Sequence, residues 1–333
     1  MNAVLALALG CAITIFPPFG TPVPSGRLHG PGLLLAGGGG GEAPPAVFTW
    51  LHRRLAGSGA RRSGNVVVLR ASGSNLYDKP FVQYGNFASV QTVLIPPCAS
   101  RAQVDRAAHV VDGADAVFFA GGDQAHYVAW KNSALMESVK RVYARGGVVG
   151  GGSAGLAIQG AVVYDSVSAD RFDAETHTAD AVAYPLEERI SFTTGLFDWP
   201  SLEDTITDTH LVVRDRLGRT VVFLARILGA HLLPGVATVY ALGIDQASAV
   251  VVDPDGTATV FNAAGGRGAY LVRAHAVPHL EPGQPFRYTV EVAHVAQNGE
   301  RFDLLHKATR RPWRQLTVDG SHSPIYSRDP YQR

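Results

Sequence analysis

Short apolar runs alternate with segments of helical spacing through the first half of the chain. The runs are bounded by glycine or polar residues, as buried strands are, and the segments between them place apolar residues three or four positions apart. Such alternation predicts βαβ units with a mostly parallel sheet and right-handed crossovers. The predicted strands cover residues 32–36, 65–69, 90–95 and 116–120 and a run ending at Val148-Val149, and the predicted helices cover 42–55, 101–111 and 127–144.

Strand patterns dominate the second half of the chain. A strand at 161–166 and a polar, acidic loop at 169–188 precede a segment, 205–227, in which we predict a helix capped by Asp208. Further strands are predicted at 239–244, 249–252, 257–261, 269–272 and 286–292, before a polar, arginine-rich end. The whole pattern predicts an α/β fold, with a mostly parallel, doubly wound sheet flanked by helices and a β-rich C-terminal part.

This pattern divides the chain into three parts. Residues 1–30 are expected to be an export signal with a Pro/Gly linker, 31–275 the main α/β domain, and 276–333 a β-containing extension packed on the same domain. An α/β sheet of this kind binds ligands outside the carboxyl ends of its strands.

Composition and charge narrow the possible classes of protein. The 333 residues are 46% hydrophobic and 17% charged, which is ordinary for a globular chain. A net charge of +1, without a dense Lys/Arg block, argues against a nucleic-acid surface. Cys11 and Cys98 make no disulfide framework and lack zinc-ligand spacing, and the histidines are scattered. We expect no metal, no cofactor and, from the prevalence of such assemblies, a homodimer.

The N-terminal residues 3–16 form an apolar run that is too short to span a bilayer but suits the core of a signal peptide. No Lys or Arg precedes the run, and Leu7-Ala8-Leu9-Gly10-Cys11 is a poor lipoprotein-type cleavage site, so a first buried strand is the alternative. Because a linker-like segment follows, we expect an exported protein, secreted, periplasmic or lipid-anchored, without a stable membrane span. A cytoplasmic location is the alternative.

The stretch from Gly146 to Ile158 carries the strongest chemical signal. A buried strand enters a small-residue turn, and Gly151-x-Ser153-x-Gly155 fits the nucleophile elbow, in which a sharp strand-to-helix turn exposes a serine hydroxyl. A helix beginning at Ala154 would also point backbone N–H groups at the reacting centre. A plain glycine-rich turn is the alternative, because glycine supplies 37 residues of this chain.

Two further loops follow predicted strands. Gly37 to Gly41 lacks the motifs of a dinucleotide or phosphate loop, so tight backbone packing explains it better than phosphate binding. Gly121-Gly122-Asp123-Gln124 follows a strand end, at the same sheet edge as Ser153.

A second constellation runs from Asp208 to Arg219. His210 is followed by Arg214, Arg216 and Arg219, and a histidine beside guanidinium groups suits base chemistry next to a carboxylate-binding pocket. His210 and Arg214 would lie one helical turn apart. A solvated basic helix face is the alternative.

Together these motifs resemble the cyanophycinase and peptidase E family of serine peptidases, over residues 32–272. The resemblance rests on the first glycine-rich loop, Phe118-Phe119-Ala120-Gly121-Gly122-Asp123-Gln124, the elbow around Ser153, and Asp208-x-His210 with its R-x-R-x-x-R array. Cyanophycinase is the closer match, because the arginine array follows the histidine. The family has a flavodoxin-like fold similar to class I glutamine amidotransferases.

The resemblance implies a serine hydrolase that cleaves β-aspartyl links, such as the β-Asp-Arg links of cyanophycin, or N-terminal aspartyl peptides. The partner would be a peptide or polymer with free carboxylates. Ser153 would be the nucleophile and His210 its general base, and N–H groups near Gly122, Asp123 and Ala154 would form the oxyanion hole. The residues matching substrate-binding positions are Gln124, Asp208, Thr209, Arg214, Arg216 and Arg219.

The chain departs from the family at two positions. Thr209 stands where the family has glutamine, and Gln246 stands where a glutamate completes the triad. An amide can orient the imidazole but cannot stabilise the imidazolium by charge, and in a serine triad this exchange has cost about 10⁴ in rate. Glu203, Asp204 or Asp245 are alternative third members.

Two other functions stay open. A binding protein that has lost turnover would explain Gln246 and Thr209. A serine esterase of the α/β-hydrolase type would place its acid between Ser153 and His210, where Asp173, Glu175, Glu203 and Asp204 occur.

Overall fold

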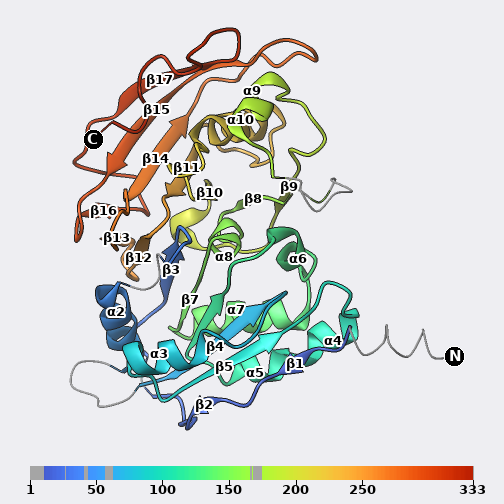
Figure 1. Cartoon of the computed structure of the whole chain (residues 1–333), viewed down its shortest axis with the longest axis vertical. Helices are drawn as coiled ribbons and strands as arrows, with labels where there is room; N and C mark the ends of the chain where they lie inside the picture. Colours follow the sequence, from blue (N-terminus) through green and yellow to red (C-terminus); the bar gives the residue numbers. More distant parts are fainter. Residues whose placement is uncertain are drawn as a thin grey trace, which may run out of the picture.

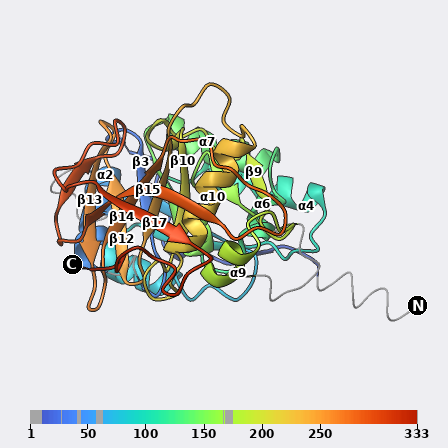
Figure 2. The same cartoon turned by 90° about the horizontal axis from the view of Figure 1, so that it is seen from above.

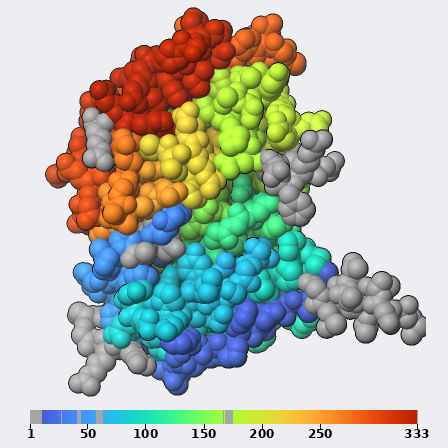
Figure 3. All heavy atoms as spheres, viewed as in Figure 1, coloured from blue at the N-terminus to red at the C-terminus, as the bar shows by residue number. Residues whose placement is uncertain are grey.

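The computed structural model describes residues 11–26, 28–40, 44–56, 63–165, 167 and 175–332. Its strands form two sheets, with the N-terminal part of the chain at one end of the molecule and the C-terminal part at the other (Figure 1). The space-filling view shows the same division, with the C-terminal residues in orange and red gathered at one end (Figure 3).

The first sheet is built around five parallel strands in the order β5-β4-β6-β7-β3. β12, β13 and β16 extend it antiparallel beside β3, and β1 and β2 pair antiparallel with β5. The bounds are β1 Thr14–Ile15, β2 Phe19–Gly20, β3 Gly32–Ala36, β4 Asn65–Arg70, β5 Ser89–Leu94, β6 Ala116–Phe119, β7 Val148–Gly152, β12 Ser248–Val252, β13 Thr257–Asn262 and β16 Arg301–Asp303.

Helices cover both faces of this sheet because its central strands are apolar on both sides. Leu33 and Leu35 of β3 pack into the core beneath α4, α5 and α7, whereas Leu34 and Ala36 pack into the core beneath α2 and α3. The bounds of the helices around this sheet are α2 Pro45–Ala56, α3 Asp78–Gly85, α4 Arg101–Arg106, α5 Ala108–Asp112, α6 Gln124–Val128, α7 Ala134–Ala144 and α8 Ala154–Ala157.

The second sheet has the order β17-β15-β14-β11-β10-β8-β9, with β8, β10 and β11 parallel and the others antiparallel to their neighbours. Helices α9 and α10 pack on one of its faces through a separate apolar core (Figure 2). The bounds are β8 Val162–Tyr164, α9 Thr178–Ala183, β9 Phe192–Thr194, the 3₁₀ helix η1 Pro200–Leu202, β10 Thr205–Thr209, α10 Leu217–Gly229, β11 Val239–Ile244, β14 Ala269–Ala274, β15 Arg287–Val295 and β17 Arg314–Asp319.

The predicted fold class is confirmed: the protein is α/β, with a mostly parallel central sheet flanked by helices and a β-rich C-terminal part. The strands predicted at 239–244, 249–252, 257–261 and 269–272 are divided between the two sheets, however. β11 and β14 join the second sheet, while β12 and β13 between them join the first. Hydrophobic pattern alone does not distinguish the pairings of β11, β12 and β14, because these three strands are largely buried, whereas β13 is only partly buried.

The prediction that Asp208 caps a helix is wrong. Asp208 lies inside β10, and the helix that follows starts only at Leu217. Its carboxylate accepts hydrogen bonds from Arg219 and Thr220 of that helix, and these bonds hold the helix alongside the strand. The acidic loop predicted at 169–188 likewise contains α9.

Two predicted helices are each divided. Residues 101–111 form α4 and α5, which meet at Ala107. Residues 127–144 contain the end of α6 and the whole of α7, because Asn132 adopts φ 62° and the Ser133 hydroxyl then caps α7 by accepting from the Met136 N–H.

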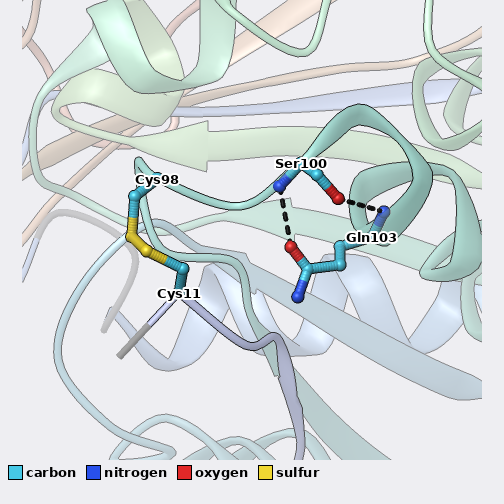
Figure 4. The surroundings of a disulfide bond; sticks show 4 residues. All are labelled: Cys11, Cys98, Ser100 and Gln103. Carbon is cyan, nitrogen blue, oxygen red and sulfur yellow. Dashed lines mark hydrogen bonds between the residues drawn. A yellow bond between two sulfur atoms is a disulfide. The ribbon is translucent and has the colours of Figure 1, made fainter. Parts of the chain in front are cut away.

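A disulfide between Cys11 and Cys98 attaches the N-terminal segment to the loop after β5 (Figure 4). Just beyond Cys98, Ser100 and Gln103 form a capping box that starts α4. Strand β1 is exposed rather than buried, and residues 1–10 of the predicted signal lie outside the described part of the chain. Within the described ranges, no helix combines the length and apolar character needed to cross a bilayer.

Close contact between β3 and β7 limits residue 150 to glycine. A methyl group at Gly150 would lie 1.9 Å from the Leu34 backbone oxygen. We expect Gly150→Ala to lower the free energy of unfolding by about 3 kcal/mol or more, because the strands must separate. Gly26→Ala is the control, since a methyl group there meets nothing within 4 Å, and it should change stability by less than about 0.5 kcal/mol. Equal urea midpoints for the two variants would contradict this account.

Candidate active site

Three side chains predicted from the sequence meet where the two sheets adjoin. Ser153 follows β7 of the first sheet, and His210 follows β10 of the second. Gln246 lies in the short turn by which the chain passes from β11 in the second sheet to β12 in the first. The site therefore depends on both sheets.

Ser153 has the backbone of a nucleophile elbow. Its φ of 53° and ψ of −116° form a sharp turn between β7 and α8. The turn is fixed from both sides: the Ser153 N–H donates to the Ala36 carbonyl at 3.0 Å, and the Ser153 carbonyl accepts from Leu156 and Ala157 at 2.9 Å. A side chain on Gly151 or Gly155 would overlap the Phe119 carbonyl, so both flanking glycines are required.

His210 links the serine to the glutamine. The Ser153 Oγ lies 3.0 Å from His210 Nε2, and His210 Nδ1 lies 3.1 Å from Gln246 Oε1. Because a carbonyl oxygen only accepts, Nδ1 carries the proton and Nε2 is left free to accept the serine proton. This is the proton arrangement that a general base needs.

The surroundings of His210 keep its ring neutral. Burial lowers the pKa of His210, the positive charge of Arg214 lowers it further, and the hydrogen bond to Gln246 opposes these effects only in part. A neutral imidazole is a competent base at neutral pH, but the imidazolium formed during reaction gains no stabilisation from a charged partner.

The glycine loop after β3 lets these side chains approach one another. A side-chain carbon at Gly38 would lie 2.4 Å from the His210 ring, and one at Gly39 would lie 2.2 Å from the Gln246 side chain. The Gly37 carbonyl accepts from the His210 N–H at 3.0 Å, and the Gly38 carbonyl accepts from the Ala247 N–H at 2.9 Å. Tight packing, as predicted, is thus confirmed at Gly37, Gly38 and Gly39, whereas a side-chain carbon at Gly40 would meet nothing within 4 Å and Gly41 lies outside the described residues.

The carboxylates considered as alternative triad members have other partners. Asp245 accepts the backbone N–H groups of Val212 and Val213, and Asp204 pairs with Lys307 at 2.7 Å. Both ring nitrogens of His210 already have Ser153 and Gln246 as partners. Asp173 lies outside the described residues, and Glu203 follows η1 at the far end of β10 from His210.

A cavity of about 620 Å³ opens beside Ser153. Gly122, Asp123 and Ala154, predicted for the oxyanion hole, line it together with Gln124. Gln124 begins α6, and its amide donates to the Tyr164 carbonyl at 3.2 Å. All the predicted substrate-binding residues reach this cavity: Gln124, Asp208, Thr209, Arg214, Arg216 and Arg219.

The arginine array is held by ion pairs. Arg219 and Asp208 are both buried and bonded to each other at 2.5 and 3.0 Å. Arg216 donates to the Thr209 hydroxyl at 2.8 Å and to Glu175, so Thr209 positions an arginine. Arg214 is the most exposed of the three and also bonds Glu175 at 2.9 Å.

Glu175 is the site residue whose contacts sequence reasoning missed. Burial alone would raise the pKa of Glu175, but hydrogen bonds and charge from Arg216, with Arg219 and Arg214, lower it overall, so the carboxylate stays ionised. Likewise, Arg219 and Arg216 hold the pKa of Asp208 below its usual range against the effect of burial. The polar loop before α9 gave no spacing from which these pairs could be deduced.

No family model and no curated protein matches this chain. Among solved structures, the chain is similar to a peptidase from an acI-B1 Actinobacterium, with a TM-score of 0.49 and 15% identity over 89% of this chain and 98% of that one. It is also similar to a candidate peptidase E protein from Listeria monocytogenes EGD-e, with a TM-score of 0.42 and 11% identity over 70% of this chain and 99% of that one. Similarity at this level does not carry function, which is argued below from the side chains.

The glutamine at the third position makes a direct test possible. Gln246→Glu should place a carboxylate against His210 Nδ1, raise the pKa of His210 and stabilise the imidazolium. We expect kcat/KM for a cleaved peptide to rise at least tenfold and up to about 10⁴-fold. Because the base acts when neutral, the acid limb of the pH profile lies below the ordinary histidine value of 6.5 in the native chain and should move upward in the variant. An unchanged rate and profile would contradict the assigned role of Gln246.

Proposed function

We propose that this protein is a serine-type peptidase that forms an acyl-enzyme on Ser153. The observation that carries the proposal is the chain of contacts from Ser153 Oγ through His210 to Gln246, on a strained turn beside an open cavity. A serine hydroxyl is a poor nucleophile until a base takes its proton, and this arrangement supplies the base.

The reaction runs in two halves. Ser153 Oγ attacks the carbonyl carbon of the scissile amide as its proton passes to His210 Nε2, and the resulting oxyanion faces the N–H groups of Gly122, Asp123 and Ala154. The C–N bond then breaks, and Nε2 returns the proton to the leaving amine. In the second half, water attacks the ester carbonyl carbon as it gives one proton to Nε2. The C–O bond to Ser153 then breaks, Nε2 returns that proton to Ser153 Oγ, and the carboxylic acid is released.

Charges around the cavity support a substrate of mixed charge. Its lining includes three arginines (Arg214, Arg216, Arg219) and four carboxylates (Asp123, Asp165, Glu175, Asp208). A purely anionic substrate would meet more negative than positive groups. A β-aspartyl–arginine unit carries a carboxylate, which could pair with the arginines of the cavity, and a guanidinium, which could pair with an exposed carboxylate such as Asp123. We therefore propose β-aspartyl peptides, including cyanophycin-type β-Asp-Arg links, as the substrate class.

A second candidate function is a binding protein with the same pocket and no turnover. Gln246 favours it, because the amide leaves the imidazolium without a charged partner. The esterase of the α/β-hydrolase type is less supported, since both nitrogens of His210 are occupied by Ser153 and Gln246 rather than by an acid.

The disulfide bears on the compartment in which the protein works. Disulfides persist in oxidising compartments, so the Cys11–Cys98 bond supports our proposal of an exported protein. A sulfur held in a disulfide has no thiol to carry a lipid, which favours a secreted or periplasmic form over one anchored through Cys11. We further propose a homodimer and one catalytic unit, 31–275, on which 276–333 packs through β15 and β17.

Digestion of purified cyanophycin, followed by product masses, tests the proposed chemistry. We expect release of β-Asp-Arg by the native chain and at least a 10³-fold loss in Ser153→Ala, because the nucleophile is removed. Undiminished release by the serine variant would exclude the acyl-serine mechanism. Binding of β-Asp-Arg without release, with cleavage gained in Gln246→Glu, would favour the binding protein instead, and activity on p-nitrophenyl esters alone would favour the esterase.

Glu175 occupies the arginine groups that a substrate carboxylate would contact. Glu175→Gln removes the negative charge that competes with a ligand carboxylate for Arg214 and Arg216. We therefore expect the variant to bind aspartate about tenfold more tightly in isothermal titration, because the arginines regain a charged hydrogen-bond partner from the ligand. Glu187→Gln is the control, because Glu187 pairs with Arg189 and does not line the cavity. Weaker binding in Glu175→Gln would show that Glu175 itself holds the ligand.

A further inference from the structure

A second cavity, of about 490 Å³, lies on the second sheet between β15, β17 and the C-terminal residues 328–332. It shares no lining residue with the cavity beside Ser153. Its apolar floor includes Val292 and Leu316, of which Leu316 is almost fully buried. The C-terminal residues that carry it belong to the orange and red part of Figure 3.

The lining of this cavity is strongly cationic. It contains Arg267, Arg311, Arg314 and Arg328 and a single carboxylate, Asp329. Arg311 pairs with Glu300, but among the described residues Arg267, Arg314 and Arg328 form no ion pair. Three such guanidinium groups against one carboxylate leave an excess of two positive charges.

Arg267 carries a donor that lacks a partner. Its Nη2 donates to the Tyr331 carbonyl at 2.7 Å, whereas its Nε is buried and has no hydrogen-bond partner within the described ranges. A buried donor left unpaired is unfavourable, so the guanidinium of Arg267 is not fully satisfied by the protein itself.

The other walls of the cavity are fixed in place. The His294 ring stacks on Tyr270 with centroids 4.0 Å apart, and its Nε2 donates to the Arg267 carbonyl at 2.6 Å. The C-terminal wall is attached through Tyr326 and Tyr331, whose hydroxyls both donate to Asp215 at 2.7 Å. The arginines therefore surround a pocket whose shape is held by packing and hydrogen bonds.

We propose that this cavity binds a small molecule bearing a dianionic oxyanion group, either a phosphate or a pair of carboxylates. Arginine binds both groups through paired N–H donors in a planar fork. The excess of two positive charges matches a dianion, and the apolar floor accommodates the carbon part of the ligand.

Isothermal titration with inorganic phosphate and with succinate, both dianions at pH 8, at constant ionic strength, tests this site in the full chain. We expect saturable binding of one molecule of at least one probe, and at least a tenfold loss of affinity in the double variant Arg314→Ala/Arg328→Ala. Both arginines are exposed, so the variant should keep the native melting temperature without ligand. Preference for phosphate would identify a phosphorylated ligand, and preference for succinate a carboxylated one.

Two controls separate this site from other basic groups. Arg310→Ala removes a nearby exposed arginine that does not line the cavity, and Arg214→Ala removes the most exposed arginine of the catalytic cavity. Both should bind the probe like the native chain. Absence of saturable binding, binding unchanged in the double variant, or an equal loss in either control would overturn the proposal.

Discussion

The site depends on one close approach, that of the glycine loop after β3 to His210 and Gln246. The loop lies within contact distance of both side chains, so that any side chain at Gly38 or Gly39 would displace them. Its carbonyls also accept N–H groups from the two segments that carry these residues. The loop belongs to the first sheet, while His210 follows a strand of the second, and the contact therefore fixes how the two sheets meet. Ser153, next to the same loop through the Ala36 carbonyl, is positioned by the same packing.

Gln246 determines what the arrangement can do chemically. Its carbonyl oxygen selects the tautomer in which His210 accepts the serine proton, which is the orienting role of the third triad member. It cannot supply the negative charge that stabilises the imidazolium. Burial and Arg214 keep the pKa of His210 low, which maintains the neutral base but opposes its protonation during reaction. The site therefore orients the His210 ring well but provides little electrostatic stabilisation of its imidazolium form.

Local features of the site could be predicted from the sequence, whereas contacts between distant segments could not. The elbow around Ser153 could be predicted because it depends only on neighbouring residues: an apolar strand, two flanking glycines and the start of a helix. His210 and its arginines were found in the same way. The role of Asp208 was missed because its partner, Arg219, comes from a helix that folds back beside the strand. Glu175 reaches the arginines from a loop without regular spacing. The division of β11, β12 and β14 between two sheets leaves no trace in hydrophobicity, since all three are largely buried.

Labelling with a fluorophosphonate tests the central claim, the activation of Ser153 by His210, without any assumption about the substrate. Intact-mass and peptide-mass measurements should show one phosphonyl group on Ser153 of the native chain, and none in His210→Ala, whose serine lacks a base. The Arg310→Ala variant, altered at an exposed residue that does not line the catalytic cavity, should label like the native chain. Absence of an adduct on Ser153 in the native chain, or equal labelling of the histidine variant, would contradict the account.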